Sequence, residues 1–332
     1  MFEIYQPNNK IVIVSLIKII LLFYKVCDKI HIMEIDNQNN IKKGTIICLI
    51  AGLFWGFSGV CGQYILQQKG ITTTWLVPFR LVFAGLIMIT IGFIMQGKQF
   101  LDVWKKDYLR LLIFALCGMT FCQFSYFSSI AASNAGTATV LQQFSIIFVM
   151  LYTCFRSKKL PDKKELISLV LALVGAFLIA THGNLNSLVM SKAGLFWGFC
   201  NALAVTMYTL IPVKLIKEYG ALAVTSWAML IGGIVLQIAF KPWTINVQLD
   251  NLIISIVIII IVFGTILPFA MYLRGVVLAG ANRAVMLSNM EPMTATILSA
   301  LLLGQNFHLM DIIGSICILS TIFILSYKSK NS

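Results

Sequence analysis

Charged residues are scarce in this chain. Asp, Glu, Lys and Arg together make up 11% of its 332 residues, against about 25% in a typical soluble domain. Hydrophobic residues, in contrast, make up 59%. So few charged side chains cannot cover the surface of a water-soluble fold of this length. The deficit excludes an ordinary soluble globular protein and indicates that most of the chain faces something other than water.

Signatures of enzymes and metal sites are also missing. The chain has no Walker A loop, no HExxH, no GxSxG and no CxxC pair. Its cysteines fall mostly in apolar segments, as small buried hydrophobic residues do. The histidines, His31, His182 and His308, lie outside or at the ends of the apolar runs. We therefore expect no enzymatic activity, no cofactor and no bound metal.

The net charge of +13 raises the question of nucleic-acid binding. The Lys and Arg residues occur in short clusters between apolar runs and do not gather in one basic segment. This pattern is typical of the cytoplasmic loops of membrane proteins. The sequence therefore predicts a lipid bilayer as the partner of the chain, and no nucleic acid.

Apolar stretches follow one another almost from end to end. About 20 apolar residues suffice for a helix to cross a bilayer, so the pattern predicts an all-α integral membrane protein with ten transmembrane helices. The predicted spans are Ile46–Leu66, Trp75–Met95, Tyr108–Ile130, Ala135–Phe155, Leu166–Thr181, Ala193–Val213, Ala221–Phe240, Leu252–Val277, Ala284–Leu303 and Leu309–Tyr327.

The charges of the loops predict the orientation of these spans. If the residues before the first span are cytoplasmic, the loops on the opposite side contain only Lys69, Lys192 and Lys241. All other basic loop residues then lie on the cytoplasmic side, as the positive-inside rule requires. We therefore expect both the N- and the C-terminus in the cytoplasm.

Residues 1–43 are expected to form a cytoplasmic or interfacial extension. The stretch Ile11–Val26 is apolar but short, and Lys18 interrupts it, which favours an amphipathic segment at the membrane surface over a further span. A second hypothesis is that the natural chain starts at Met33 and that residues 1–32 are a start-site artefact.

The chain repeats itself. The hexapeptide at Gly52–Phe57 recurs identically at Gly194–Phe199, and Tyr126–Ala135 has an echo at Tyr272–Ala281. Residues 44–181 and 191–327 therefore look like two copies of one five-helix unit. Because a unit with an odd number of spans ends on the opposite side from its start, the second copy must be inverted. Inverted repeats with a substrate site at their interface are a recurrent transporter architecture.

These residues resemble the drug/metabolite transporter superfamily, specifically its EamA-type members, over 44–327. The resemblance rests on the Gly-Leu-Phe-Trp-Gly openings of both halves, on Phe79 and Arg80, and on Leu287–Pro292. The family usually has a proline in the fourth helix at the position of Ile146. The resemblance implies ten helices, cytoplasmic ends, the plasma (inner) membrane, and movement of amino acids or other metabolites. It implies no particular substrate.

Glu291 is the only acidic residue deep inside a predicted span. Ionisable residues at that depth are costly and often serve substrate or proton pathways. We interpret Glu291 as a partner for a substrate amine or as a proton carrier; the structural alternative is a hydrogen-bonded, neutral Glu. Arg80 is the cation that lies deepest within a predicted span, and it can bind a carboxylate, pair with Glu291, or snorkel to the membrane surface.

Amides and aromatic rings at mid-span depth complete the candidate site. Amides there turn inward to find partners, and Trp55 and Trp197 occupy equivalent positions in the two repeats. Helix packing and interfacial anchoring are the structural alternatives. The residues predicted to bind substrate are Glu291, Trp55, Tyr126, Gln142, Gln143, Asn201, Asn289, Arg80 and Trp197, and Gln123, Tyr208 and Tyr272 are further candidates.

The sequence thus favours a secondary transporter, expected to export a small organic solute such as an amino acid or a drug-like compound. A nucleotide-sugar or vitamin carrier is an alternative, although such solutes favour more cations within the spans than Arg80 alone. A non-transporting membrane scaffold is a further alternative. The sequence is compatible with a homodimer.

Overall fold

The computed structural model describes residues 37–133, 135–181, 191–303 and 308–326. The chain divides into two compact units, Met1–Asn40 and Ile41–Ser332, and the site discussed below belongs to the second. Most of the extension expected at 1–43 lies outside the described residues, and so do Ile11–Val26 and a start at Met33.

Every regular element of the described residues is a helix, and no strand occurs among them. In chain order, the first group of α-helices is α2 (Asn37–Gln63), α3 (Thr73–Gln96), α4 (Asp102–Ile113), α5 (Phe121–Ala132), α6 (Ala135–Gln142), α7 (Phe144–Ser157) and α8 (Lys163–Thr181). The second group is α9 (Lys192–Leu210), α10 (Val213–Phe240), α11 (Asn251–Ile261), α12 (Leu267–Ala279), α13 (Ala281–Leu287), α14 (Met290–Leu303) and α15 (Leu309–Ser326). The expectation of an all-α fold is confirmed.

Seven helical stretches of the described chain are long and apolar enough to cross a membrane. They are Asn39–Gln68, Thr73–Ala132, Ala138–Ser157, Lys192–Leu210, Val213–Phe240, Asn251–Ala279 and Ala281–Leu302. A shorter apolar stretch follows at Ile312–Thr321. Seven is fewer than the ten spans that the sequence predicts, and one of the seven contains 60 residues, about three times the length that one crossing needs.

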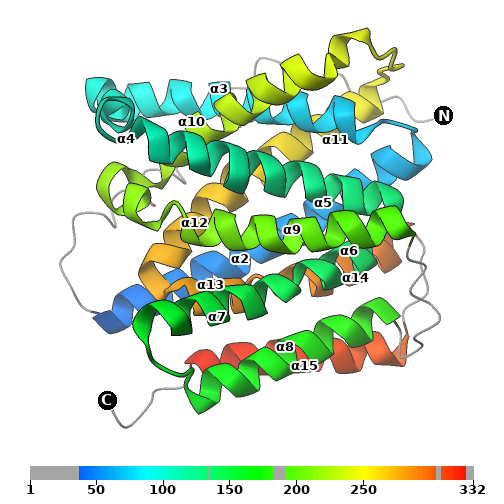
Figure 1. Cartoon of the computed structure of the whole chain (residues 1–332). Helices are drawn as coiled ribbons and strands as arrows, with labels where there is room; N and C mark the ends of the chain where they lie inside the picture. The colour runs from blue at the N-terminus through cyan, green and yellow to red at the C-terminus, as the bar shows by residue number, and fades with distance from the viewer. Residues whose placement is uncertain (1–36, 134, 182–190, 304–307, 327–332) are drawn as a thin grey trace. The chain divides into compact units, whose positions relative to one another are not determined.

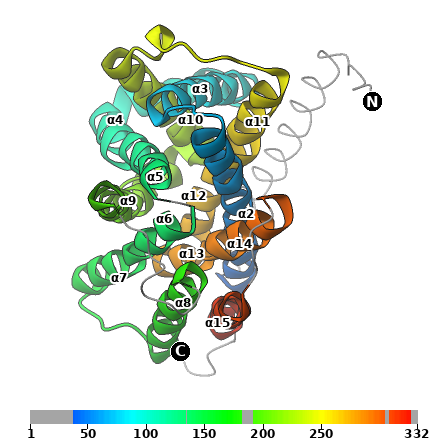
Figure 2. The same cartoon turned by 90° about the vertical axis from the view of Figure 1, so that its right-hand side faces the viewer.

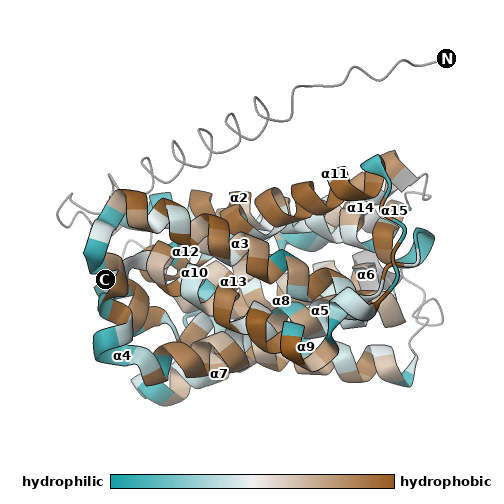
Figure 3. Ribbon diagram, turned by 90° about the horizontal axis from the view of Figure 1, so that it is seen from above, coloured by the Kyte–Doolittle hydropathy of each residue, from teal (hydrophilic) through white to brown (hydrophobic). Residues whose placement is uncertain are grey.

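Large apolar side chains point outward from these helices. Ile94, Leu301 and Phe323 are 70%, 74% and 74% exposed, while polar residues such as Gln123, Asn201 and Asn289 are almost completely buried. Figure 3 shows hydrophobic residues along the lengths of helices such as α3, α9 and α11, with hydrophilic residues at helix ends and connections. A hydrocarbon surrounding explains this inversion, since it solvates apolar groups and leaves polar groups to pair internally.

Helices distant in sequence pair closely. Helix α3 packs along α10, α5 along α9, and α8 along α15 (Figures 1 and 2). At the first pair, a Cβ on Gly85 would lie 2.7 Å from the backbone nitrogen of Leu230, and one on Gly233 would lie 2.7 Å from that of Val82. Glycine is needed at both positions because the two backbones nearly touch.

Two predicted spans contain a tight turn, called a break below, although each remains part of one helical stretch, Ala138–Ser157 in one and Ala281–Leu302 in the other. In the span Ala135–Phe155 the break lies at Gln143, between α6 and α7, and in the span Ala284–Leu303 it lies at Ser288 and Asn289, between α13 and α14. In the second break, the backbone N–H of Glu291 donates to the carbonyl oxygen of Ser288 at 2.9 Å. Pro292 then falls in the first turn of α14, where its missing N–H leaves no carbonyl unpaired.

Two further spans contain a π-helical turn, η3 (Phe114–Thr120) in one and η6 (Val262–Ile266) in the other. In each turn a threonine hydroxyl donates to the carbonyl five residues earlier: Thr120 to Ala115 at 2.6 Å and Thr265 to Ile260 at 3.0 Å. Such turns widen the helix and often occur at functional sites.

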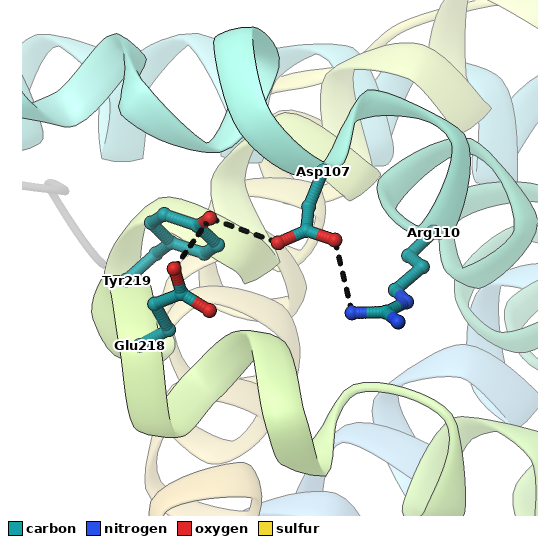
Figure 4. A network of polar contacts seen from close by, with 4 residues as sticks. All are labelled: Asp107, Arg110, Glu218 and Tyr219. Atoms are coloured by element: carbon teal, nitrogen blue, oxygen red, sulfur yellow. Dashed lines mark hydrogen bonds and ion pairs between the residues drawn. The ribbon is translucent and has the colours of Figure 1, made fainter.

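A polar network joins α4 to α10 at one end of the helices (Figure 4). The Tyr219 hydroxyl lies 2.9 Å from Asp107 Oδ2 and 2.9 Å from Glu218 Oε1, and Arg110 pairs with Asp107 at 3.0 Å. Next to it, Gly220 adopts φ 82° and kinks α10. The network holds the chain where this helix changes direction.

We expect Tyr219→Phe to lower the free energy of unfolding by about 0.5–1.5 kcal/mol, the usual contribution of one hydrogen bond. One hydroxyl proton serves only one carboxylate at a time, so the loss corresponds to a single bond. Thermal unfolding of the detergent-purified protein measures it. Tyr152→Phe, which removes an exposed hydroxyl, is the control, and an equal midpoint for both variants would contradict the expectation.

Candidate functional site

A cavity lies among the helices at the level of the helix breaks and of η6. Its volume is about 40 Å³, measured as the space open to the centre of a water molecule, and one water needs roughly 10–15 Å³ on that measure. The cavity is lined by Trp55, Ser58, Arg80, Cys122, Gln123, Tyr126, Phe127, Gln142, Val205, Tyr208, Gly264, Phe269, Tyr272, Ser288 and Glu291. It has room for a few waters, so a solute of any size needs the helices to move apart.

Glu291 enters the cavity from the first turn of α14, directly after the break. Its side chain is 2% exposed. Its Oε2 accepts a hydrogen bond from Gln142 Nε2 at 2.9 Å, and Gln142 Oε1 accepts one from Asn201 Nδ2 at 2.8 Å. The two broken helices therefore meet through their polar side chains. None of the ion pairs among the described residues involves Glu291.

Tyr126 stands beside the same carboxylate. Its hydroxyl lies close enough to the Glu291 carboxylate to interact with it, and no other partner for it is found among the described residues. Gly59 makes room for it, because a Cβ at that position would lie 2.8 Å from the hydroxyl oxygen. A small shift of either helix would let Tyr126 donate to Glu291 or to a bound solute.

Arg80 is buried on another side of the cavity. It is 1% exposed, so the snorkelling alternative is wrong. Its Nε donates to Thr265 Oγ1 at 3.1 Å and its Nη2 to the Gly264 carbonyl at 3.4 Å. Its guanidinium carbon lies 4.4 Å from the centre of the Phe127 ring, a favourable cation–π contact. The widened turn η6 supplies both of its oxygen partners.

Aromatic rings form one wall of the cavity. The Trp55 ring centre lies 5.0 Å from that of Phe269 and 5.1 Å from that of Tyr272, and Tyr208 stacks on Tyr272 at 5.7 Å. The Tyr208 hydroxyl donates to the Phe269 carbonyl at 3.1 Å. These separations are typical of packed aromatic pairs, and the wall offers an apolar surface to a solute.

The structure brings together five of the predicted site residues as cavity lining: Glu291, Trp55, Tyr126, Gln142 and Arg80. Of the other four, Asn201 does not line the cavity but donates a hydrogen bond to Gln142, which does. The remaining three, which do not line the cavity, are Gln143, Asn289 and Trp197.

Trp197 packs against Phe124 and Phe196, with ring centres 5.5 and 5.2 Å away. It therefore does not repeat the role of Trp55, although the hexapeptides around the two residues are identical.

Several lining residues were not predicted from the sequence, notably Phe127, Phe269, Gly264 and Ser288. Nothing in their residue type separates them from the other aromatic and small residues of apolar spans. The one usable signal is the repeat, since Ser288 lies at the break of one half and Gln142 lies next to the break of the other. Within the described residues no group of three or more His, Cys, Asp or Glu side chains is arranged to hold a metal ion.

A family model described as the EamA-like transporter family matches this chain twice, at residues 42–181 and at residues 192–327. The chain belongs to the EamA-like transporter family. The resemblance expected from the sequence is thereby confirmed. With its apolar helices, this member of the family is a multi-pass membrane protein.

Relatives of this family member are described as transporters. An uncharacterized inner membrane transporter, YicL, of Salmonella typhimurium is 39% identical over 88% of this chain and 98% of its own length. An uncharacterized transporter, YetK, of Bacillus subtilis is 23% identical over 87% and 89%. A solved crystal structure superposes with a TM-score of 0.69, over 85% of this chain and 96% of its own, at 12% identity, which supports the fold alone.

Proposed function

We propose that this family member is a secondary transporter that exports a small organic metabolite by alternating access between two inverted five-helix repeats. The observation that carries the proposal is the cavity to which both helix breaks contribute lining residues, with Glu291 on its wall. Breaks at mid-membrane depth are tolerated only where the backbone is buried in protein or lines a cavity. They are a common way to build the central site of a carrier.

The repeats, 44–181 and 191–327, are supported by matching local structure. Gly56 of the first repeat packs on α14 of the second, and Gly198, its counterpart, packs on α6 of the first: added Cβ atoms would lie 2.6 Å from the Glu291 carbonyl oxygen and 2.7 Å from Leu141 Cβ. The corresponding helices α3 and α10, and α8 and α15, pair across the halves. Reciprocal contacts between equivalent helices are expected of two copies related by an axis in the membrane plane.

Ten spans follow if the 60-residue stretch crosses the membrane twice and α8 and α15 also cross. The stretch reverses at Gly97, whose φ of 56° is open to glycine but disfavoured for other residues. Basic loop residues then predict cytoplasmic termini. The relative named an inner membrane transporter supports the same membrane for this chain.

In the proposed cycle the halves rock about the cavity, which has to widen to hold a solute because it now has room for only a few waters. Glu291 is the candidate proton carrier, as the sole acidic side chain on the cavity wall.

An untargeted metabolite comparison tests the proposal. Cells expressing wild type, Glu291→Ala or the exposed control Asp162→Ala at matched levels are compared, inside and in the medium. We expect one solute class to move to the medium with wild type and the control only. Equal redistribution with Glu291→Ala would contradict the site, and saturable binding without flux in proteoliposomes would indicate a scaffold.

A further inference from the structure

Three hydrogen-bond donors on the cavity wall have no partner among the described residues. They are Trp55 Nε1, Arg80 Nη1 and Gln123 Nε2. A buried donor without an acceptor is costly, and native structures rarely leave several together. All three are N–H groups, so each can donate a hydrogen bond to a ligand. The wall is therefore prepared for a group rich in acceptors.

The buried guanidinium of Arg80 indicates that the bound group is an anion. Its guanidinium is buried, and no ion pair among the described residues involves it. Its present partners, Thr265 Oγ1 and the Gly264 carbonyl, are neutral. A cation removed from water without a counter-ion is strongly destabilising, and Nη1, which has no partner on the cavity wall, is available to bind an anion.

The anion carries one negative charge. When Glu291, on the same cavity wall, is neutral, the Arg80 guanidinium neutralises one negative charge and a phosphate dianion would leave an excess charge. When Glu291 is ionised, the wall is already neutral, and the bound acid needs an ammonium of its own beside Glu291. A carboxylate also matches the planar fork of an Arg side chain. The aromatic wall at Trp55, Phe269 and Tyr272 accepts an apolar remainder of the solute.

We propose that Arg80, with Trp55 and Gln123, forms a binding subsite for the carboxylate of the transported solute. The proposal rests on the proposed transport function and refines it: the solute is a small organic acid with an apolar body. An acid that also carries an amine would present its ammonium to Glu291, whereas a simple acid would use the Arg80 subsite alone.

Ligand-induced thermal stabilisation of the full-length purified protein tests the subsite. The probes are 4-methylpentanoate, its amide, leucine, leucine amide and 3-methylbutylamine, together with the acid and amide pairs of three- to six-carbon chains. We expect at least one acid to bind wild type roughly tenfold or more tightly than its amide, the minimum for a buried charge-assisted contact. Leucine binding better than 4-methylpentanoate would identify an amino acid, and the reverse would identify a simple acid.

Variants assign the preference to Arg80. Arg80→Gln should bind acid and amide equally, Arg80→Lys should keep part of the preference because it keeps the charge, and the exposed control Arg156→Gln should match wild type. The thermal unfolding midpoint of each variant without ligand shows whether the variant folds. If Arg80→Gln does not fold, Arg80→Lys alone tests the subsite. Equal binding of every acid and its amide to wild type, or an undiminished preference in Arg80→Gln and Arg80→Lys, would overturn the subsite.

Flux in proteoliposomes separates this inference from the proposed function. Flux of neutral or cationic solutes without any preference for acids would contradict the subsite and leave the transporter standing. Acid binding that depends on Arg80, without flux of the same acid, would contradict the transporter and leave the subsite standing.

Discussion

Replacing Glu291 with glutamine is expected to lower solute flux in proteoliposomes by at least about tenfold, in the range typical of removing one buried charge from a binding site. Glutamine keeps the shape of the side chain and a carbonyl that can accept from Gln142 Nε2, which bonds Glu291 Oε2 at 2.9 Å in the wild type. It cannot ionise, so it can neither pair with an ammonium nor carry a proton. Folding should be nearly unchanged, because the same hydrogen bond can form.

Flux at several imposed pH gradients separates the two roles of Glu291. Loss of flux at every gradient indicates a partner for a substrate amine, whereas loss only of the part driven by the gradient indicates proton coupling. Glu165→Gln, which changes a half-buried carboxylate at the start of α8, is the control. Transport by Glu291→Gln as fast as by wild type at every gradient would rule out the proton role.

Gly56→Val is expected to destabilise the protein strongly. A Cβ at Gly56 would lie 2.6 Å from the Glu291 carbonyl oxygen and 2.6 Å from Thr294 Cβ. One of these obstacles is backbone, so α14 itself has to move. Overpacking of this kind costs about 1–3 kcal/mol or more, and the shift would also displace the Glu291 side chain from Gln142.

The unfolding midpoint of the detergent-purified protein, together with flux, measures the effect of Gly56→Val. Leu53→Val is the matched control, because Leu53 lies three residues earlier on the same helix and is 39% exposed. We expect a lower midpoint and loss of flux for Gly56→Val and near wild-type values for the control. An unchanged midpoint would mean that α2 and α14 do not approach as closely as described.

The helical class and the family were predictable from sequence because hydrocarbon imposes a simple rule. A span must be apolar and helical, so composition alone reveals its position, and an acidic residue such as Glu291 stands out against that background. The identical hexapeptides at Gly52–Phe57 and Gly194–Phe199 likewise indicate a duplication through their sequence alone.

Other features were not predictable, because they depend on neighbours distant in the chain. Equal sequence around Trp55 and Trp197 predicts equal roles for the two residues, yet only Trp55 lines the cavity. Snorkelling of Arg80 is excluded only by Phe127 and Thr265, which surround it from other helices. No proline near Gln143 predicts the break there. Its relation to the break at Ser288 is visible only in the folded structure.

The sequence by itself determined that the chain is helical, that it belongs in a membrane, that it is built from two related halves, and that Glu291 is exceptional. These properties follow from local composition and repetition, which each segment carries alone. The tertiary structure decided which polar side chains meet, where the helices break around the cavity, and that Arg80 is buried with a free donor. All three features depend on which faces of separate helices pack together. The packing energy of a helix face is set by residues far apart in the chain, as the contact between Arg80 and Thr265 illustrates.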